Sequence, residues 1–276
     1  MPELPEVEIL ARDLKNVIEK KRIKNIEILN ESTFKGEKND LEKIINKRVV
    51  EVFRRGKFLV VFLENNFVLC AHLRMTGKFS VKKHTDPKLK FERVRFDFEN
   101  FSLCFSDQRK FGKIWLCQKK ELLEFTGMKN LGIEPFSNNY KSEVLYDLFK
   151  NKKGPIKKWL LDQSLIAGLG NIYSDEACFH AQLKPQHKIE NLKKKNFEKL
   201  FDSVLEALNL GIRNRGTSFS EHKEADYKDI YGEAGKNYAF LYVYGRAKKD
   251  CLRCGAILRK TKVAGRTTVY CGRCQR

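Results

Sequence analysis

The sequence predicts a multidomain α+β protein: an N-terminal helix with an antiparallel β-sandwich or barrel-like domain, then a helical domain and a C-terminal zinc-binding hairpin. Three observations predict this order. Apolar residues recur with helical spacing at the start of the chain, alternate as in strands over residues 22–118, and return to helical spacing after residue 140. Two Cys-x-x-Cys pairs follow near the C-terminus. The length of 276 residues also favours two domains over one.

The first helix is expected over residues 5–21. Pro5 suits the first helical position because a proline loses no hydrogen bond there. Glu6 and Glu8 suit the positive end of the helix dipole. The apolar residues that share one face are Val7, Leu10, Ala11, Leu14, Val17 and Ile18. This spacing predicts an amphipathic helix.

Five runs rich in Val, Leu and Phe predict strands. The runs are residues 49–53, 58–63, 67–70, 94–98 and 101–105. The short polar pairs Asn65-Asn66 and Glu99-Asn100 separate neighbouring runs and are typical of hairpin turns. The sheets should therefore be antiparallel.

Beyond Leu131–Phe136 the strand pattern stops. Helices are then expected at about 141–150, 155–163, 171–180 and 190–213. Residues 216–238 are polar and aperiodic, which predicts a long loop of the kind that often covers a ligand. The expected domains are residues 1–132, 133–237 and 238–276.

The four C-terminal cysteines predict one structural zinc ion. They are Cys251, Cys254, Cys271 and Cys274, and sixteen residues separate the two pairs. Four thiolates complete a tetrahedral zinc site and leave no open position, which excludes a catalytic metal. Basic residues without an intervening acid lie between the pairs, so the hairpin favours phosphate contact. A zinc ribbon that only packs or binds protein is the alternative.

The charge balance points to a polyanionic partner. Lys and Arg number 55 against 35 Asp and Glu, a formal net charge of +20. Nucleic acid is the commonest such partner, although charge alone does not separate DNA from RNA or a membrane surface. Cys70, Cys104, Cys117 and Cys178 are scattered and are expected to be buried free thiols, which indicates a reducing compartment. With no apolar run of membrane-spanning length and no signal peptide, a cytoplasmic protein is expected.

Pro2 is a candidate nucleophile. An initiator methionine is usually removed before a small residue, and removal here would leave a secondary amine. An α-amine has a pKa near 8, about two units below that of lysine, so more of it is unprotonated at neutral pH. Glu3 beside it could act as an acid or base. Taken alone, Pro2 could equally be an ordinary proline before a helix.

Five motifs, in this order along the chain, favour Pro2 as a nucleophile over an ordinary proline. They are Pro2–Glu8, Arg55–Phe58, His72–Gly77, Ile166–Tyr173, and Val243–Arg246 with the four-cysteine hairpin. Over nearly its whole length the chain resembles the bacterial formamidopyrimidine-DNA glycosylases, which are 8-oxoguanine DNA glycosylases and AP lyases. The resemblance implies a helix–two-turns–helix in the helical domain and a bifunctional enzyme of base excision repair.

The resemblance also implies the chemistry. Pro2 would attack C1′ of a flipped, oxidised purine nucleotide, form a Schiff base, and cut the strand by β- and δ-elimination; a base inside a duplex must be extruded first. Glu3 would be the acid or base. Glu6 would order the site, or merely favour the helix N-terminus. Lys57 is expected in the same catalytic site.

Three residues match the wedge that fills the hole left by the extruded base: Met75, Arg109 and Phe111. Met and Phe near strand ends are by default core residues, but these lie in polar loops that end in glycine. The family usually has Asp-Pro-Arg-Arg-Phe-Gly in the second loop, whereas this chain has Gln108 and Lys110. The missing proline leaves the stiffness of this loop in question.

The resemblance assigns further side chains to DNA contacts. These are Lys57, His72, Lys157, Asn171, Tyr244, Lys260 and Arg266. For Lys57 and Lys260, a solvated surface charge is the alternative. The expected partner is damaged double-stranded DNA and not a membrane, with the protein acting as a monomer in the cytoplasm at the nucleoid.

The loop at about 216–237, which would cover the lesion, is longer and more acidic than is usual in the family. The preference among oxidised bases is therefore open. An endonuclease VIII-like enzyme for oxidised pyrimidines is one alternative, although such enzymes begin Pro-Glu-Gly-Pro-Glu and this chain has Leu4. A noncatalytic protein that binds damaged DNA is another.

Overall fold

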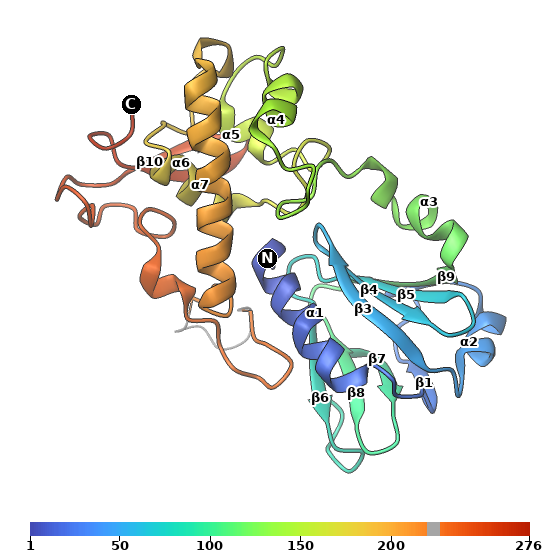
Figure 1. The fold of residues 1–276 in the computed structure, drawn as a ribbon. Coiled ribbons are helices and arrows are strands. Elements are labelled where there is room, and N and C mark those ends of the chain that lie inside the picture. Colours follow the sequence, from blue (N-terminus) through green and yellow to red (C-terminus); the bar gives the residue numbers. More distant parts are fainter. Residues whose placement is uncertain (220–226) are drawn as a thin grey trace. The chain divides into compact units, whose positions relative to one another are not determined.

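The computed structural model describes residues 1–219 and 227–276 (Figure 1). The chain divides into two compact units. The N-terminal unit comprises Met1–Lys129 with Asn214–Lys236, and the C-terminal unit comprises Asn130–Arg213 with Asn237–Arg276.

The N-terminal unit begins with helix α1 (Leu4–Ile18), which starts at a capping box. The side chain of Glu3 accepts a backbone hydrogen bond from the first turn, and the Glu6 side chain accepts the N–H of Glu3 in return. The helix ends three residues earlier than expected, because the chain turns extended at Glu19 and left-handed at Lys20. The predicted apolar face is largely buried, and α1 contacts β3 and β4 (Figure 1).

Two sheets follow. The first has the order β2-β9-β5-β4-β3 and the second β1-β7-β8-β6. Their strands are β1 Asn25–Ile28, β2 Phe34–Lys35, β3 Val49–Arg55, β4 Phe58–Leu63, β5 Phe67–His72, β6 Lys78–Lys82, β7 Glu92–Asp97, β8 Ser102–Ser106 and β9 Lys113–Gln118. All five predicted strands are present, and the pairs are antiparallel as expected, apart from the short parallel pair β2–β9. Two short helices, α2 Lys38–Ile44 and α3 Leu122–Thr126, complete the unit.

One apolar core joins the two sheets and α1. Leu14 of α1, Val61 and Leu69 of the first sheet, and Phe96 and Leu103 of the second all belong to it. Burying a side chain of this size stabilises the fold by about 1.5–3 kcal/mol. The core therefore holds the ends of the strands, and the loops that leave them, in fixed positions.

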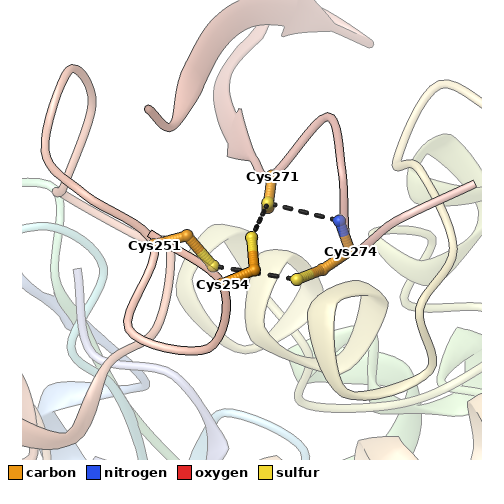
Figure 2. A group of neighbouring side chains, drawn as sticks. All are labelled: Cys251, Cys254, Cys271 and Cys274. Carbon is orange, nitrogen blue, oxygen red and sulfur yellow. Dashed lines mark hydrogen bonds between the residues drawn. The ribbon is translucent and has the colours of Figure 1, made fainter. Parts of the chain in front are cut away.

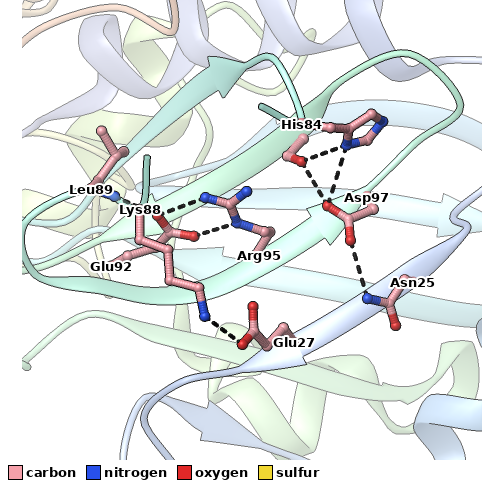
Figure 3. A network of polar contacts seen from close by, with 9 residues as sticks. Asn25, Glu27, His84, Lys88, Leu89, Glu92, Arg95 and Asp97 are labelled. Carbon is pink, nitrogen blue, oxygen red and sulfur yellow. Dashed lines mark hydrogen bonds and ion pairs between the residues drawn. The ribbon is translucent and has the colours of Figure 1, made fainter. Parts of the chain in front are cut away.

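A polar network braces the second sheet (Figure 3). Asp97 accepts hydrogen bonds from Ser102 Oγ at 2.6 Å and from Asn25 Nδ2 at 3.1 Å, so one carboxylate joins β1, β7 and β8. Arg95 pairs with Glu92 at 2.7 Å. Burial acts to raise the pKa of Glu92, but the hydrogen bonds and charge of Arg95 outweigh it and hold that pKa below its ordinary value.

The C-terminal unit contains all four expected helices. They are α4 Ser142–Phe149, α5 Ile156–Leu160, α6 Asn171–His180 and α7 Lys194–Arg213. Helix α7 packs along α6, where a Cβ at Gly211 would lie 2.5 Å from the hydroxyl oxygen of the buried Tyr173. Strands β10 Arg259–Val263 and β11 Arg266–Tyr270 form the C-terminal hairpin, which contacts α6.

The segment after α7 groups with the N-terminal unit, although the sequence analysis placed residues 216–237 in the helical domain. The physical reason is a set of polar contacts to α1, of which the one to Glu6 is buried. The N–H of Thr217 donates to Glu6, and Arg215 pairs with Asp13. The part of the expected lesion loop at residues 220–226 lies outside the described residues.

The four scattered cysteines are free and buried, as expected. Burial raises the pKa of each thiol, to about 12 for Cys104 and about 11 for Cys117. Within residues 1–219 and 227–276, no helix combines the length and the apolar character needed to span a membrane.

Candidate functional site

The N-terminus is held in place by a buried carboxylate. Pro2 and Glu3 are buried, and α1 begins directly after them. Glu6 accepts the N–H of Glu3 at 2.8 Å with one oxygen and the N–H of Thr217 at 2.9 Å with the other. Glu6 therefore connects the start of the chain to the segment that follows α7. It does more than favour the N-terminus of the helix, which was the alternative role expected from the sequence.

A small cavity brings Pro2 to two other elements of the N-terminal unit. Its lining includes Met1, Pro2, Met75, Thr76 and Tyr227. The candidate nucleophile thus lies beside the loop that carries Met75 and beside Tyr227, in the described part of the segment 216–237. Because Met1 is part of the lining, its removal would free the amine of Pro2 directly into this space.

Lys57 and His72 lie at the same end of the paired strands β4 and β5: Lys57 directly precedes β4, and His72 is the last residue of β5. A tight turn at Gly56, whose φ is +57°, joins β3 to β4 and carries Lys57. His72 ends β5, and its Nδ1 accepts the N–H of Arg74 at 3.0 Å. Burial and the nearby charges of Arg74 and Lys57 lower the pKa of His72 to about 3. His72 is therefore neutral, with its proton on Nε2, and acts as a hydrogen-bond donor rather than a cation.

The wedge residues lie at exposed loop tips. Met75 is 39 % exposed and Phe111 is 52 % exposed, so neither is a core residue. The guanidinium carbon of Arg109 lies 4.9 Å from the centroid of the Phe111 ring, a cation–π contact that holds the two side chains together. The structure thus agrees with the loop position that the sequence favoured for these residues.

Lys157 corrects an expectation, because it cannot contact DNA from its position. Its side chain is 0 % exposed, and its ammonium group pairs with the equally buried Asp175 at 2.5 Å. It also donates to Thr268 Oγ1 at 2.8 Å. Asp175 in turn accepts the N–H of Val269 at 3.2 Å. Burial acts to raise the pKa of Asp175, and the charge of Lys157 opposes this. The pair attaches β11 to α5 and α6.

Asn171 begins α6 and also supports the hairpin. Its Nδ2 donates to the carbonyl of Thr267 at 3.1 Å, which uses one of its two amide hydrogens. Gly168, with a φ of +94°, shapes the turn before this helix. The positive end of the helix dipole at the start of α6 makes Asn171 a candidate for contact with an anion.

Glu176 is a site residue that sequence analysis missed. Its buried carboxylate accepts the backbone N–H groups of Tyr242, Val243 and Tyr244 at 2.8–2.9 Å. Burial raises the pKa of Glu176, and these three hydrogen bonds act against the rise. The available signal was the acidic pair Asp175-Glu176 between the apolar pairs Ile172-Tyr173 and Ala177-Cys178. Glu176 fixes the backbone that presents Tyr244.

Lys260 and Arg266 are exposed on the C-terminal hairpin. Ala264 and Gly265 both have positive φ, as a two-residue hairpin turn requires, and Arg266 follows directly. This turn places the guanidinium group of Arg266 next to the tip of the hairpin. Both cations are therefore accessible to a phosphate.

The four-cysteine cluster fits a zinc ion (Figure 2). The Sγ atoms of Cys251, Cys254, Cys271 and Cys274 all lie within 4.8 Å of one another, with Cys251–Cys274 at 3.9 Å and Cys254–Cys271 at 3.5 Å. Tetrahedral zinc with four thiolates separates the sulfurs by about 3.8 Å. The guanidinium of Arg253, inside the first pair, lies 4.4 Å above the ring of Phe179 and secures this knuckle to α6.

Comparison with known families covers most of the chain. Residues 1–114 match the formamidopyrimidine-DNA glycosylase N-terminal domain, residues 131–223 match the H2TH domain of the same enzymes, and residues 248–276 match the zinc finger found in FPG and IleRS. The chain belongs to the formamidopyrimidine-DNA glycosylase family. Its fold class is the expected one, and the zinc-finger match together with the cysteine cluster is consistent with one structural zinc ion.

Individual relatives cover the full chain. The formamidopyrimidine-DNA glycosylases of Pelotomaculum thermopropionicum and Ureaplasma parvum are 38 % and 37 % identical to it, over 100 % of this chain and 99–100 % of theirs. Among solved structures, the Lactococcus lactis enzyme in complex with DNA containing Fapy-dG has a TM-score of 0.91 and 33 % identity, with 100 % of both chains covered. Its complex with abasic-site DNA also has a TM-score of 0.91, with 99 % coverage.

Breaking the buried ion pair of the C-terminal unit should destabilise it. Lys157→Met leaves the Asp175 carboxylate buried without its cation, which typically costs about 3–5 kcal/mol in the free energy of unfolding. Urea unfolding followed by circular dichroism measures this. Lys158→Met, at the exposed neighbouring position, should change stability by less than about 0.5 kcal/mol.

The double variant Lys157→Met with Asp175→Asn should recover much of the loss, because it removes the unpaired charge and keeps an oxygen for the N–H of Val269. A Lys157→Met protein with wild-type stability and weakened DNA binding would instead restore Lys157 as a DNA contact.

Loss of one cysteine ligand should remove the zinc. Cys271→Ser should reduce the zinc content from about one ion per chain to near zero, and the hairpin should unfold with it, because binding of the metal drives folding in so small a unit. Metal analysis and limited proteolysis test this. Cys117→Ser, which changes a buried thiol outside the cluster, should keep its zinc; a Cys271→Ser protein that kept it would contradict the assignment.

Proposed function

We propose that this protein is a base-excision-repair DNA glycosylase that removes oxidised purines from duplex DNA and then cuts the strand at the abasic site. Full-length membership of the formamidopyrimidine-DNA glycosylase family supports the proposal. The similar Lactococcus lactis enzyme was solved with Fapy-dG and with abasic-site DNA. The observation that carries it is the N-terminus, where Pro2 is fixed through Glu3 and Glu6 beside the loop of Met75.

The reaction starts from the free amine of Pro2. Its nitrogen attacks C1′ of the extruded nucleotide, the bond from C1′ to the base breaks, and the base leaves with a proton. Opening of the sugar ring gives a positively charged imine (an iminium) between Pro2 and C1′, which water hydrolyses after the eliminations to free Pro2. Loss of a C2′ proton then expels the 3′ phosphate, and a second elimination expels the 5′ phosphate. Glu3 is the acid or base beside these atoms, and Glu6 holds it in position.

DNA is bound by cations and donors from both units. The candidates are Lys57, His72, Asn171, Tyr244, Lys260 and Arg266. His72 donates as a neutral imidazole, and Arg266 and Lys260 act as exposed cations. Because several phosphates are neutralised, affinity should decrease steeply with salt concentration. The protein works as a monomer at the nucleoid; the catalytic domain includes the described part of the segment after α7, and the helix–two-turns–helix and zinc-finger domains belong to the C-terminal unit.

Oxidised pyrimidines are the alternative class of substrate. The Lactococcus lactis enzyme, 33 % identical to this chain, also forms a complex with DNA that contains an oxidised pyrimidine. The segment 216–237, which is longer and more acidic than is usual in the family, is the part of the chain that would change the balance between the two classes. A noncatalytic role as a damage-binding protein is excluded if the amine of Pro2 reacts.

Borohydride trapping tests the nucleophile. With a duplex that contains 8-oxoguanine opposite cytosine, the mature protein should form a covalent adduct that maps to the N-terminal peptide, since borohydride reduces an imine and only an amine forms one. Intact mass should show the loss of Met1. A form with an added N-terminal tag should bind the duplex and trap nothing.

Pro2→Gly is the matched variant, since it keeps a free N-terminal amine and should retain weak trapping. Trapping that persisted in the tagged form would move the nucleophile to a lysine, with Lys57 first. No trapping by the mature form on any oxidised base or abasic site would favour the noncatalytic alternative.

The wedge should matter for extrusion and little for a sugar that is already accessible. Phe111→Ala should reduce excision of a paired oxidised purine far more than cleavage at an abasic site, because the ring fills the stack only when a base leaves it. Single-turnover rates on the two duplexes give the ratio. Equal losses on both, with a lower melting temperature, would show that Phe111 is a packing residue.

A further inference from the structure

We propose that Asp107 is the positioning residue of the wedge: its buried carboxylate locks the loop that carries Met75 to the loop that carries Arg109 and Phe111. This inference rests on the proposed function. It concerns how the wedge is made rigid before DNA binds, because none of the three wedge side chains is held by the core.

The contacts of Asp107 join both loops at one point. The residue directly follows β8 and is 1 % exposed. Its Oδ1 accepts a short hydrogen bond from Thr76 Oγ1, next to Met75. The same oxygen accepts the N–H of Arg109 at 3.1 Å, and Oδ2 accepts the N–H of Gly112 at 2.7 Å. Both ends of the second wedge loop and the tip of the first thus bind one carboxylate.

A second contact closes the link between the loops. The N–H of Arg109 also lies 3.2 Å from Thr76 Oγ1, so the Thr76 hydroxyl donates to Asp107 and accepts from the wedge arginine. A buried carboxylate needs all of these donors, because an ionised group without them would be costly in an apolar surrounding. If the loops separated, the buried carboxylate of Asp107 would therefore lose its hydrogen-bond donors.

The backbone under the loops gives Asp107 a rigid base. Its N–H donates to the carbonyl of Phe91 at 3.0 Å, and its carbonyl accepts Arg93 Nε at 2.9 Å. The ring of the buried Phe105 allows no side chain at Gly77 or Gly112, where a Cβ would lie 2.9 and 2.7 Å from its ring carbon. The loops are thus pressed against one aromatic ring while the carboxylate holds their ends.

This arrangement explains how the second wedge loop can be stiff without the proline that the family usually has there. Gln108 replaces the residue that usually stiffens the second loop, and Lys110 adopts a left-handed φ of +59°. Hydrogen bonds at Arg109 and Gly112, on either side of Lys110, restrict the loop without a proline. Asp107 therefore sets the direction in which Arg109 and Phe111 enter the stack, although it touches neither DNA nor the reacting atoms.

Three variants separate this role from a general loss of stability. Asp107→Asn keeps the shape but places an N–H₂ group against one of the donors. Thr76→Val removes only the hydroxyl bridge, and Thr76→Ser restores it. The matched control is Asp97→Asn, which removes another carboxylate with two side-chain donors from the same sheet, at the network of Figure 3.

Single-turnover excision of 8-oxoguanine from a duplex is compared with cleavage of the same duplex that carries an abasic site. Asp107→Asn and Thr76→Val should reduce the ratio of the two rates by about tenfold, the effect of one lost hydrogen bond to a charged group. Thr76→Ser should stay near the wild-type ratio, and Asp97→Asn should keep it whatever its melting temperature. The fluorescence of a 2-aminopurine beside the lesion should show less unstacking for the first two variants.

An unchanged ratio in Asp107→Asn, or an equal decrease in Asp97→Asn, would overturn the role of Asp107. That outcome differs from failure of the proposed function, in which the wild-type protein itself would process neither duplex.

Discussion

Buried carboxylates whose oxygens accept hydrogen bonds hold four of the candidate functional segments of this structure in place. A carboxylate inside a protein is stable only when its oxygens are paired. Each such group therefore fixes the segments that supply its donors. Glu6, Asp107, Asp175 and Glu176 all act in this way, in a chain with a net charge of +20.

This constraint divides the residues into two kinds. Buried charged residues are paired inside the protein and hold backbone segments in place. The candidate ligand-contacting residues, some of them exposed and some buried as Pro2 and Glu3 are, lie on those segments. Glu6 fixes the turn at Pro2 and Glu3, and Glu176 fixes the backbone of Tyr244. Lys157 belongs to the first kind, since its ammonium group is used entirely inside the protein. The basic residues left at the surface, such as Arg266, are the candidates for contact with DNA.

Much of the fold could be predicted because local patterns report local structure. The alternation in residues 58–63 and 67–70 predicted β4 and β5, and the paired cysteines predicted a cluster that the structure assembles. The loop positions of Met75 and Phe111 were also predicted, because polar neighbours and a following glycine are poorly suited to a core. The expected helix bounds differ from the observed ones by a few residues, as at Lys20, where a left-handed residue ends α1.

Long-range partners were beyond the reach of the sequence. Lys157 resembles any surface lysine until α6 places Asp175 against it, more than a dozen residues along the chain. The same applies to the segment after α7, which joins the N-terminal unit because Glu6 and Asp13 lie where Thr217 and Arg215 can reach them.

The sequence by itself determined the family, the order of the elements, the zinc ligands and the candidate nucleophile, because each depends on residue type and short spacing. Only the tertiary structure decided which polar residues are buried and which are free to contact a ligand. Burial depends on residues distant in the chain. It determines that the charge of Lys157 is paired inside the protein, whereas the charge of Arg266 stays at the surface, where a phosphate can reach it.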